Sequence, residues 1–208
     1  MRAIRWRAWV IGGVLLAVGP AVAGTTGALA SRPAGTSGSA DPVLVWSGYA
    51  EQAVVAGRPP ASSAVLLGTV HVGMYDAAVA LGLPAQPFLA RERTARGTSA
   101  ATPNATVSHP LLVARVPGQR ETVDAQYVRY LADLPDGPAR RAGVSLGERV
   151  AARVLRWRAG DGLDAEVPYV QRPPGPGVWQ PTAPTPPVDL VLTQVRPLAS
   201  HRSSRRPR

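Results

Sequence analysis

The sequence contains no cysteine and no lysine, and it has a single phenylalanine. Without cysteine the chain can form neither a disulfide framework nor a thiolate zinc site, and it has no thiol nucleophile. Without lysine it cannot use a P-loop, a Schiff base or a lysine in an anion-binding cage. All 23 basic residues are arginines. These absences exclude several common enzyme mechanisms before any motif is considered.

The formal net charge of +10 is concentrated at the two ends of the chain. A charge of this size is typical of proteins that bind nucleic acid or anionic surfaces. Between the two arginine-rich ends, however, 16 arginines face all 13 acidic residues, as on an ordinary solvated surface. We therefore expect no nucleic-acid partner for the body of the chain. Binding of an anion or a nucleic acid through the arginines of residues 199–208 remains an alternative.

Residues 1–30 are predicted to form a secretory signal peptide. Three arginines precede a short apolar stretch from Trp9 to Ala23, and A-V-A (21–23) and A-L-A (28–30) are candidate cleavage sites. The alternative is a membrane anchor, but the stretch is short for a bilayer span and is interrupted by glycines and Pro20. We expect a secreted protein with no stable membrane span after cleavage, in which residues 31–40 form a flexible polar linker.

Residues 41–162 are predicted to form an all-α helical bundle of about five helices. Apolar residues recur there at three- and four-residue spacing, and no strand-like alternation is longer than three or four residues. The predicted helices cover residues 41–56, 61–81, 106–116, 121–134 and 138–159. The second is apolar nearly all round and is expected to be the most buried. Pro110 is expected near the first turn of the third. Gly143 and Gly147 predict close approach of a neighbouring helix.

Residues 163–198 are predicted to be extended, because a segment this rich in proline cannot form a helix or a central strand. Trp179 lies between prolines in G-V-W-Q-P-T-A-P (177–184). We expect its ring to pack on the apolar surface of the helices. The alternative is a proline-rich ligand for a recognition module.

His71, Tyr75 and Asp76 are the first candidates for chemistry. His71 and Tyr75 are four residues apart on one helix face, and Asp76 is turned away by about 100°. A metal or acid–base site is imaginable, but one histidine with one carboxylate is under-ligated. We interpret the group as polar residues of a buried helix whose hydrogen bonds are satisfied. His109 is expected to cap a helix or to be exposed, and His201 belongs to the arginine-rich end.

Asp161, Asp164 and Glu166 are the second candidates. Their spacing is not that of an EF-hand loop, and they offer few ligands for Ca²⁺. We interpret them as a solvated turn with helix-capping acids. The sequence contains no G-x-S-x-G, H-E-x-x-H or G-x-G-x-x-G motif. The residues alone predict an exported helical protein with no catalytic, cofactor-binding or metal-binding residue.

Several strings, taken in order, resemble the bacterial vanadium-dependent haloperoxidases of the type-2 phosphatidic acid phosphatase superfamily. They are P-P-A-S-S-A-V-L-L-G-T-V-H-V-G-M-Y-D-A-A-V-A (59–80), P-G-Q-R-E-T-V-D-A-Q-Y (117–127), Y-L-A-D-L-P-D-G-P-A-R-R-A-G-V-S-L-G (130–147), R-A-G-D-G (158–162), G-V-W-Q-P-T-A-P (177–184) and Q-V-R-P-L (194–198). The resemblance covers residues 41–198. It implies a secreted helical peroxidase in which bound vanadate reacts with peroxide to oxidise halide, or an acid phosphatase-like enzyme.

The resemblance also implies a vanadate site that this sequence does not contain. In the family the site lies in the C-terminal half and uses a lysine, arginines, a P-S-G-H string and a further histidine that binds vanadium. Fixed positive donors of this kind offset the charge of an oxyanion. This chain has no lysine and no P-S-G-H. We therefore expect it to resemble only the N-terminal helical half, to bind no vanadate and to be inactive alone.

From Ala199 the sequence changes to A-S-H-R-S-S-R-R-P-R, a run that a shifted reading frame in GC-rich DNA would produce. We expect a truncated or frame-shifted member of the family, which should self-associate through exposed apolar surface. The alternative from another functional class is a secreted helical binding or structural module without catalysis.

Overall fold

The computed structural model describes residues 41–89, 91–182 and 187–199. Within them the chain forms five α-helices and two short 3₁₀ helices, and no strand. The helices are α1 (Pro42–Gly57), α2 (Pro60–Ala80), α3 (Thr102–Arg115), η1 (Pro117–Gln119), α4 (Arg120–Ala132), α5 (Pro138–Arg158) and η2 (Leu190–Thr193). The all-α prediction is confirmed. The predicted signal peptide (1–30), the linker (31–40) and residues 200–208 of the arginine-rich tail lie outside the described residues.

Four of the five α-helices begin and end within two residues of their predicted bounds. At the start of α1, Asp41 accepts a hydrogen bond from the Val43 amide at 2.8 Å. This bond satisfies one of the amides that a helix N-terminus leaves without an intrahelical acceptor. The predicted cap at Asp41 is confirmed.

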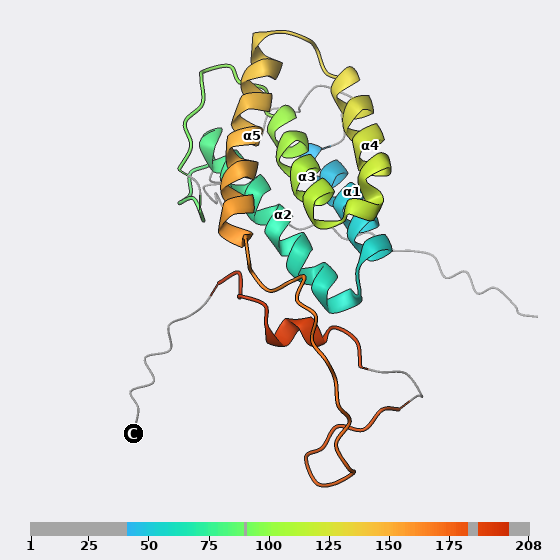
Figure 1. The fold of residues 1–208 in the computed structure, drawn as a ribbon. Coiled ribbons are helices and arrows are strands. Elements are labelled where there is room, and N and C mark those ends of the chain that lie inside the picture. Colours follow the sequence, from blue (N-terminus) through green and yellow to red (C-terminus); the bar gives the residue numbers. More distant parts are fainter. Residues whose placement is uncertain (1–40, 90, 183–186, 200–208) are drawn as a thin grey trace, which may run out of the picture. The chain divides into compact units, whose positions relative to one another are not determined.

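α3 is the central helix, and the prediction that the second helix would be the most buried was wrong. α3 packs against all four other α-helices (Figure 1), and ten of its 14 residues are buried, against nine of 21 in α2. Buried hydroxyls are tolerated because they bond within the helix: Thr106 donates to the Thr102 carbonyl at 3.1 Å and Ser108 to the Asn104 carbonyl at 2.8 Å. Position in the bundle, not hydropathy, therefore decides which helix is buried.

The prediction that Pro110 lies near a first turn was also wrong, because α3 begins at Thr102 and contains Pro110 in its interior. Pro103 occupies the first turn instead. A proline is tolerated there because the amide hydrogen that it lacks would have no acceptor within the helix. Pro110 removes the amide that would bond the Thr106 carbonyl. The helix continues past it, with Leu111 and Leu112 both buried.

α3 and α5 lie against each other through glycines, as predicted. A methyl group added at Gly147 would lie 2.6 Å from the Thr106 Cβ, and one at Gly143 would lie 2.7 Å from the Thr102 Cβ. The backbones of α3 and α5 therefore approach more closely than a side chain at either glycine position would allow.

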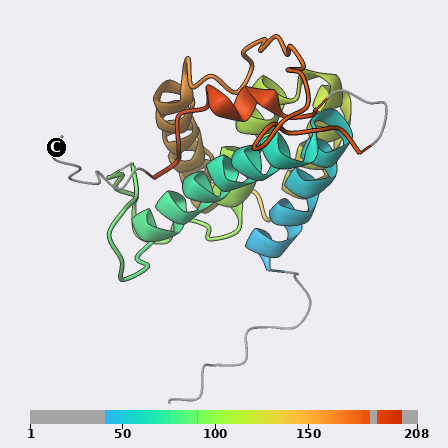
Figure 2. The same ribbon diagram turned by 90° about the horizontal axis from the view of Figure 1, so that it is seen from below.

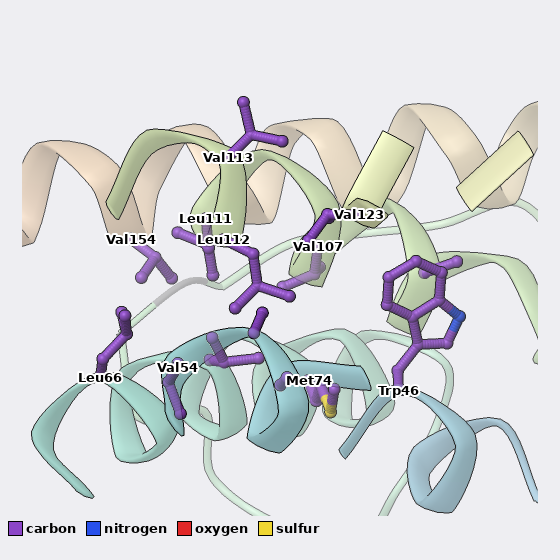
Figure 3. Packing of buried hydrophobic residues seen from close by; sticks show 14 of the residues in the cluster. Trp46, Val54, Leu66, Met74, Val107, Leu111, Leu112, Val113, Val123 and Val154 are labelled. Carbon is purple, nitrogen blue, oxygen red and sulfur yellow. The ribbon is translucent and has the colours of Figure 1, made fainter. Parts of the chain in front are cut away.

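The hydrophobic core lies between the helices and is mostly aliphatic. The Trp46 ring, fully buried, has edge-to-face contacts with Tyr49, Tyr127 and Tyr130 at centroid distances of 5.4, 6.1 and 5.6 Å. Figure 3 shows Trp46 at one end of the cluster and Val154 and Leu66 at the other. Between them lie the buried residues Val54, Met74, Val107, Leu111, Leu112 and Val123. The cluster joins all five α-helices.

After α5 the chain leaves the helices and then returns to them. Residues 165–182, which we call the arm, project away from the helices in Figure 1 and are nearly all exposed. Residues 187–198, which we call the strap, include η2 and lie beside α2 (Figure 2). A methyl group added at Gly68 of α2 would lie 2.6 Å from the Leu198 Cδ1, so the strap packs directly on that helix.

Candidate functional site

Among the described residues, a cluster of buried charged side chains lies where α5 ends and the strap passes beside it. Arg158, the last residue of α5, donates to Asp161 with Nε 2.6 Å from Oδ2, and each side chain is 2% exposed. Arg115 donates to the other oxygen of Asp161 at 2.9 Å and contacts Asp164 at 3.1 Å. Arg58 also pairs with Asp164. We call these three arginines and two aspartates the arginine–aspartate cluster.

Asp161 is the centre of this cluster. Burial alone would raise the pKa of its carboxyl, but the hydrogen bond from the Leu163 amide and the charges of Arg115 and Arg158 outweigh it. The net effect is a lowered pKa, so the carboxylate stays ionised. Asp161 thus accepts hydrogen bonds from two guanidinium groups while it fixes the turn that follows α5.

The Arg158 guanidinium is shared among three neighbours. Besides Asp161, it donates Nη1 to the Arg196 carbonyl at 2.8 Å, and it lies 5.1 Å from the centre of the Trp157 ring. Its Nη2 is buried and has no acceptor within the described part of the chain. Arg158 therefore links the end of α5 to the strap.

The strap is attached at both of its ends. The Arg196 amide donates to the Asp161 carbonyl at 2.8 Å, and the Arg196 side chain bonds the Trp157 carbonyl. At the other end, Asp189 accepts from the Ala61 and Ser62 amides at 2.8 and 3.1 Å. Partial burial would raise the pKa of Asp189, but these bonds lower it overall. Asp189 thus caps α2, whose own first residues provide no side-chain cap.

The interpretation of Asp161, Asp164 and Glu166 as a solvated turn was wrong for Asp161. That residue is 3% exposed, and its oxygens accept from two guanidinium groups and an amide. Asp164 pairs with Arg58 and Arg115, and Glu166 is exposed. Since arginines already occupy the carboxylate oxygens, a calcium ion would have to displace them. The cluster is suited to holding the strap on the bundle.

His71, Tyr75 and Asp76 point to different neighbours. His71 is exposed and its Nε2 lies 2.9 Å from the Ser47 Oγ, while the Tyr75 hydroxyl donates to the Gln86 carbonyl at 2.7 Å. Asp76 is fully buried and accepts from the Phe88 and Leu89 amides at 2.6 and 2.9 Å. The prediction of satisfied hydrogen bonds is confirmed, with His71 on the surface rather than inside.

His109 is neither a cap nor a freely exposed residue, so that expectation was wrong. Because α3 begins earlier than predicted, His109 lies in its middle. Its Nε2 lies 2.6 Å from the Asp124 Oδ1, and its ring stacks on Tyr127 with centroids 4.2 Å apart. His109 therefore joins α3 to α4. His201 lies outside the described residues.

Trp179 does not pack on the helices as predicted. It is 52% exposed and contacts Tyr169 of the same arm, edge to face, with centroids 6.1 Å apart. Gln171 donates to the Trp179 carbonyl at 3.0 Å, and the Val178 amide closes a turn by donating to the Gly175 carbonyl at 3.1 Å. The arm folds back on itself, because the turn at Gly175 brings the two aromatic residues together.

The sequence indicated the Arg158–Asp161 pair only weakly, as two residues three positions apart in R-A-G-D-G. Arg58 and Arg115 gave no signal, because they are distant in sequence from the aspartates they contact. Within the described residues, no three histidine, cysteine, aspartate or glutamate side chains come together as a metal site would need. The expectation that no catalytic, cofactor-binding or metal-binding residue is present stays a prediction.

α2 is long and apolar enough to cross a membrane by length and composition alone. The core helix of a soluble protein passes the same test, and 44% of the apolar window in α2 is buried against the other helices. Comparison with family models, curated proteins and solved structures finds no match for this chain.

Proposed function

We propose that this chain is a secreted relative of the bacterial vanadium-dependent haloperoxidases that carries their helical N-terminal half and does not itself bind vanadate. The kinship is supported by the ordered strings between residues 59 and 198. An all-α bundle over the same residues is compatible with it. Vanadate, when bound, would supply the site at which peroxide is activated toward halide.

The arginine–aspartate cluster is poorly suited to holding a vanadate ion. A bound oxyanion needs several positive donors whose charge is not already compensated. Arg58, Arg115 and Arg158 are all paired with Asp161 or Asp164. An anion placed among them would meet two carboxylates. The pairing of each arginine with a carboxylate is the observation that carries the proposal of an inactive chain.

The two described histidines do not supply a vanadium ligand beside those arginines. His71 is engaged with Ser47 on the surface, and His109 with Asp124 between α3 and α4. Neither contacts the arginine–aspartate cluster.

The second candidate function is a secreted binding or structural module without catalysis. The exposed arm favours it, because Tyr169 and Trp179 are 39% and 52% exposed while held in a defined turn. Aromatic residues that are held rigid and exposed are typical of binding surfaces. The two candidates are compatible, since a helical half without its catalytic partner can still bind other proteins.

Vanadate titration followed by ⁵¹V NMR tests the absence of the site. We expect no line broadening and no bromide oxidation with vanadate and peroxide, and saturable binding or robust turnover would overturn the proposal. An active bacterial vanadium haloperoxidase, run in parallel, shows that the conditions support activity. Kinship is tested separately on the genomic DNA after codon 208, read in the other frames: a lysine- and arginine-rich segment with P-S-G-H supports it, and its absence counts against it.

A further inference from the structure

The arm displays an apolar surface that nothing in the described chain covers. Val170 is 82% exposed, Trp179 52% and Tyr169 39%. The arm nevertheless keeps its shape through the Tyr169–Trp179 ring contact and the hydrogen bonds of Gln171. A preformed projection loses little conformational freedom on binding, so the arm is suited to insert into a groove.

A groove lies at the opposite end of α5, where α4 ends and α5 begins. Its volume is about 410 Å³, and its lining includes the side chains of Leu131 and Val144. Arg140 holds its wall in place, because it bonds the Leu131 and Leu134 carbonyls at 2.9 and 3.2 Å and Asp136 at 2.9 Å. The groove is therefore preformed and partly apolar, with space for an indole ring.

The arm does not lie in the groove of its own chain. α5 separates the two, because the groove is built on its first half and the arm follows its last residue. The groove residues of α5, Arg140 to Glu148, lie about 15–27 Å along the helix from Arg158. Figure 1 shows the arm projecting away from the helices at the end of α5 that is distant from the α4–α5 connection. Contact between arm and groove therefore requires two molecules.

The two surfaces offer one pair of opposite charges. Arg172 is the only charged residue between Val167 and Val188, and no ion pair of the described residues includes it. Glu148 borders the groove, is exposed and likewise has no ion pair in the part of the chain that the structure describes. Arg141 lines the same groove, where its guanidinium can stack on an inserted indole ring.

We infer that the arm of one molecule inserts Trp179 into the groove between α4 and α5 of a second copy, with Arg172 facing Glu148. The contact joins two different surfaces, so it is head to tail. One copy of such a pair still offers a free groove and the other a free arm, so further copies can add as concentration rises. This inference does not depend on the kinship with haloperoxidases.

Sedimentation velocity of the secreted protein tests this assembly over about 1–300 µM, a range that detects micromolar and weaker contacts. We expect the mean mass to rise steadily with concentration. Trp179→Ser should weaken association at least tenfold, as at an interface hot spot. Leu44→Ser, on α1 and 71% exposed, is the control and should leave association unchanged. A wild-type protein that stays monomeric, or equal loss in both variants, would overturn the inference.

A charge swap tests which groove the arm enters. Arg172→Glu and Glu148→Arg should each weaken association about threefold or more, and the double variant should recover it. A mixture of the two single variants should also recover association, because both contacts between unlike variants are matched: the Arg172→Glu arm with the Glu148→Arg groove, and the Arg172 arm with the Glu148 groove. Failure of the double variant to recover, with Trp179→Ser still defective, would show that the arm docks elsewhere and would overturn the assignment of the groove. All substituted side chains are exposed, and circular dichroism checks that the variants remain folded.

Discussion

The Arg158 Nε lies 2.6 Å from the Asp161 Oδ2, and both side chains are 2% exposed. The pair joins the last residue of α5 to the turn that follows it, and the strap is anchored on both partners through Arg196. Burying two charges costs solvation that their attraction recovers only while both are present. The pair is therefore a point at which a single substitution has a large effect.

Asp161→Asn should lower the free energy of unfolding by about 3–5 kcal/mol, because it leaves the Arg158 guanidinium buried without a counter-charge. The measurement is urea unfolding followed by circular dichroism. Asp164→Asn is the matched control: its side chain is 58% exposed, so the loss should stay below about 1 kcal/mol. Equal losses in the two variants would contradict a buried pair.

Stability should fall in acid through Asp161, Asp189 and Glu92, the last of which accepts hydrogen bonds from Arg149 and Arg153 at 3.0 and 2.7 Å. Neighbouring arginines and amides outweigh burial and lower the pKa of each of these carboxyls in the folded protein. Each carboxyl therefore contributes stability that is fully present above its unfolded pKa, about 4. The contribution is lost as pH falls through the folded pKa, because the unfolded chain binds the proton more tightly.

Urea midpoints between about pH 2.5 and 6 measure this dependence, in which each carboxyl changes the slope by at most about 1.4 kcal/mol per pH unit. Asp189→Asn should make the profile shallower below about pH 4 without changing its sign. A chain that becomes more stable on acidification over this range would contradict the lowered pKa values.

Asp189→Ala should cost about 1–2 kcal/mol, because it removes the side chain that caps α2 in the described part of the chain. Asp189 also has a φ of 58°, in the left-handed region that aspartate and asparagine tolerate better than alanine. Hydrogen exchange should therefore accelerate at the Ala61 and Ser62 amides. Asp133→Ala, an exposed aspartate after α4, is the control and should change stability by less than about 0.5 kcal/mol. Unchanged exchange at both amides would show that another group caps α2.

Gly147→Ala and Gly48→Ala should change the stability of the protein in opposite directions. In a helix interior, alanine is favoured over glycine by about 1 kcal/mol. Nothing lies within 4 Å of a methyl group added at Gly48, so that variant should gain stability. At Gly147 the methyl group would lie 2.6 Å from the Thr106 Cβ and 3.0 Å from the Pro103 carbonyl, so α3 and α5 must separate and about 1–3 kcal/mol should be lost. Thermal unfolding of the pair checks the prediction, and a stabilised Gly147→Ala would contradict the close packing.

Predictions from the sequence were most accurate for features that depend on residues close together in the chain. Asp41-Pro42 gave the start of α1, and the glycines of α5 gave the close contact with α3, because capping and helix-face spacing depend on residues a few positions apart. The prediction was least accurate for the third helix. It relied on the rule that prolines occur in the first turn of a helix, but contacts with neighbouring helices keep α3 helical on both sides of Pro110.

Rules of this local kind could not predict most of the candidate site, because its contacts join residues that are distant in sequence. Arg58 lies 106 positions from Asp164, and Arg115 lies 46 from Asp161. Nothing in the pattern of either arginine distinguishes it from a surface residue. The prediction for Trp179 was wrong for a related reason: its apolar ring predicted packing on the helices, yet it contacts Tyr169 across a turn closed at Gly175.

Periodicity and composition were enough to predict a helical region within residues 41–162 and to establish that cysteine, lysine and the P-S-G-H string are absent, because neither depends on a partner in space. The fold was needed to show that α3 is the central helix, that Asp161 binds Arg115 and Arg158, and that Asp189 caps a helix that begins more than a hundred residues earlier. Burial and ion pairing depend on which segments meet, and that is fixed by the packing of the whole bundle.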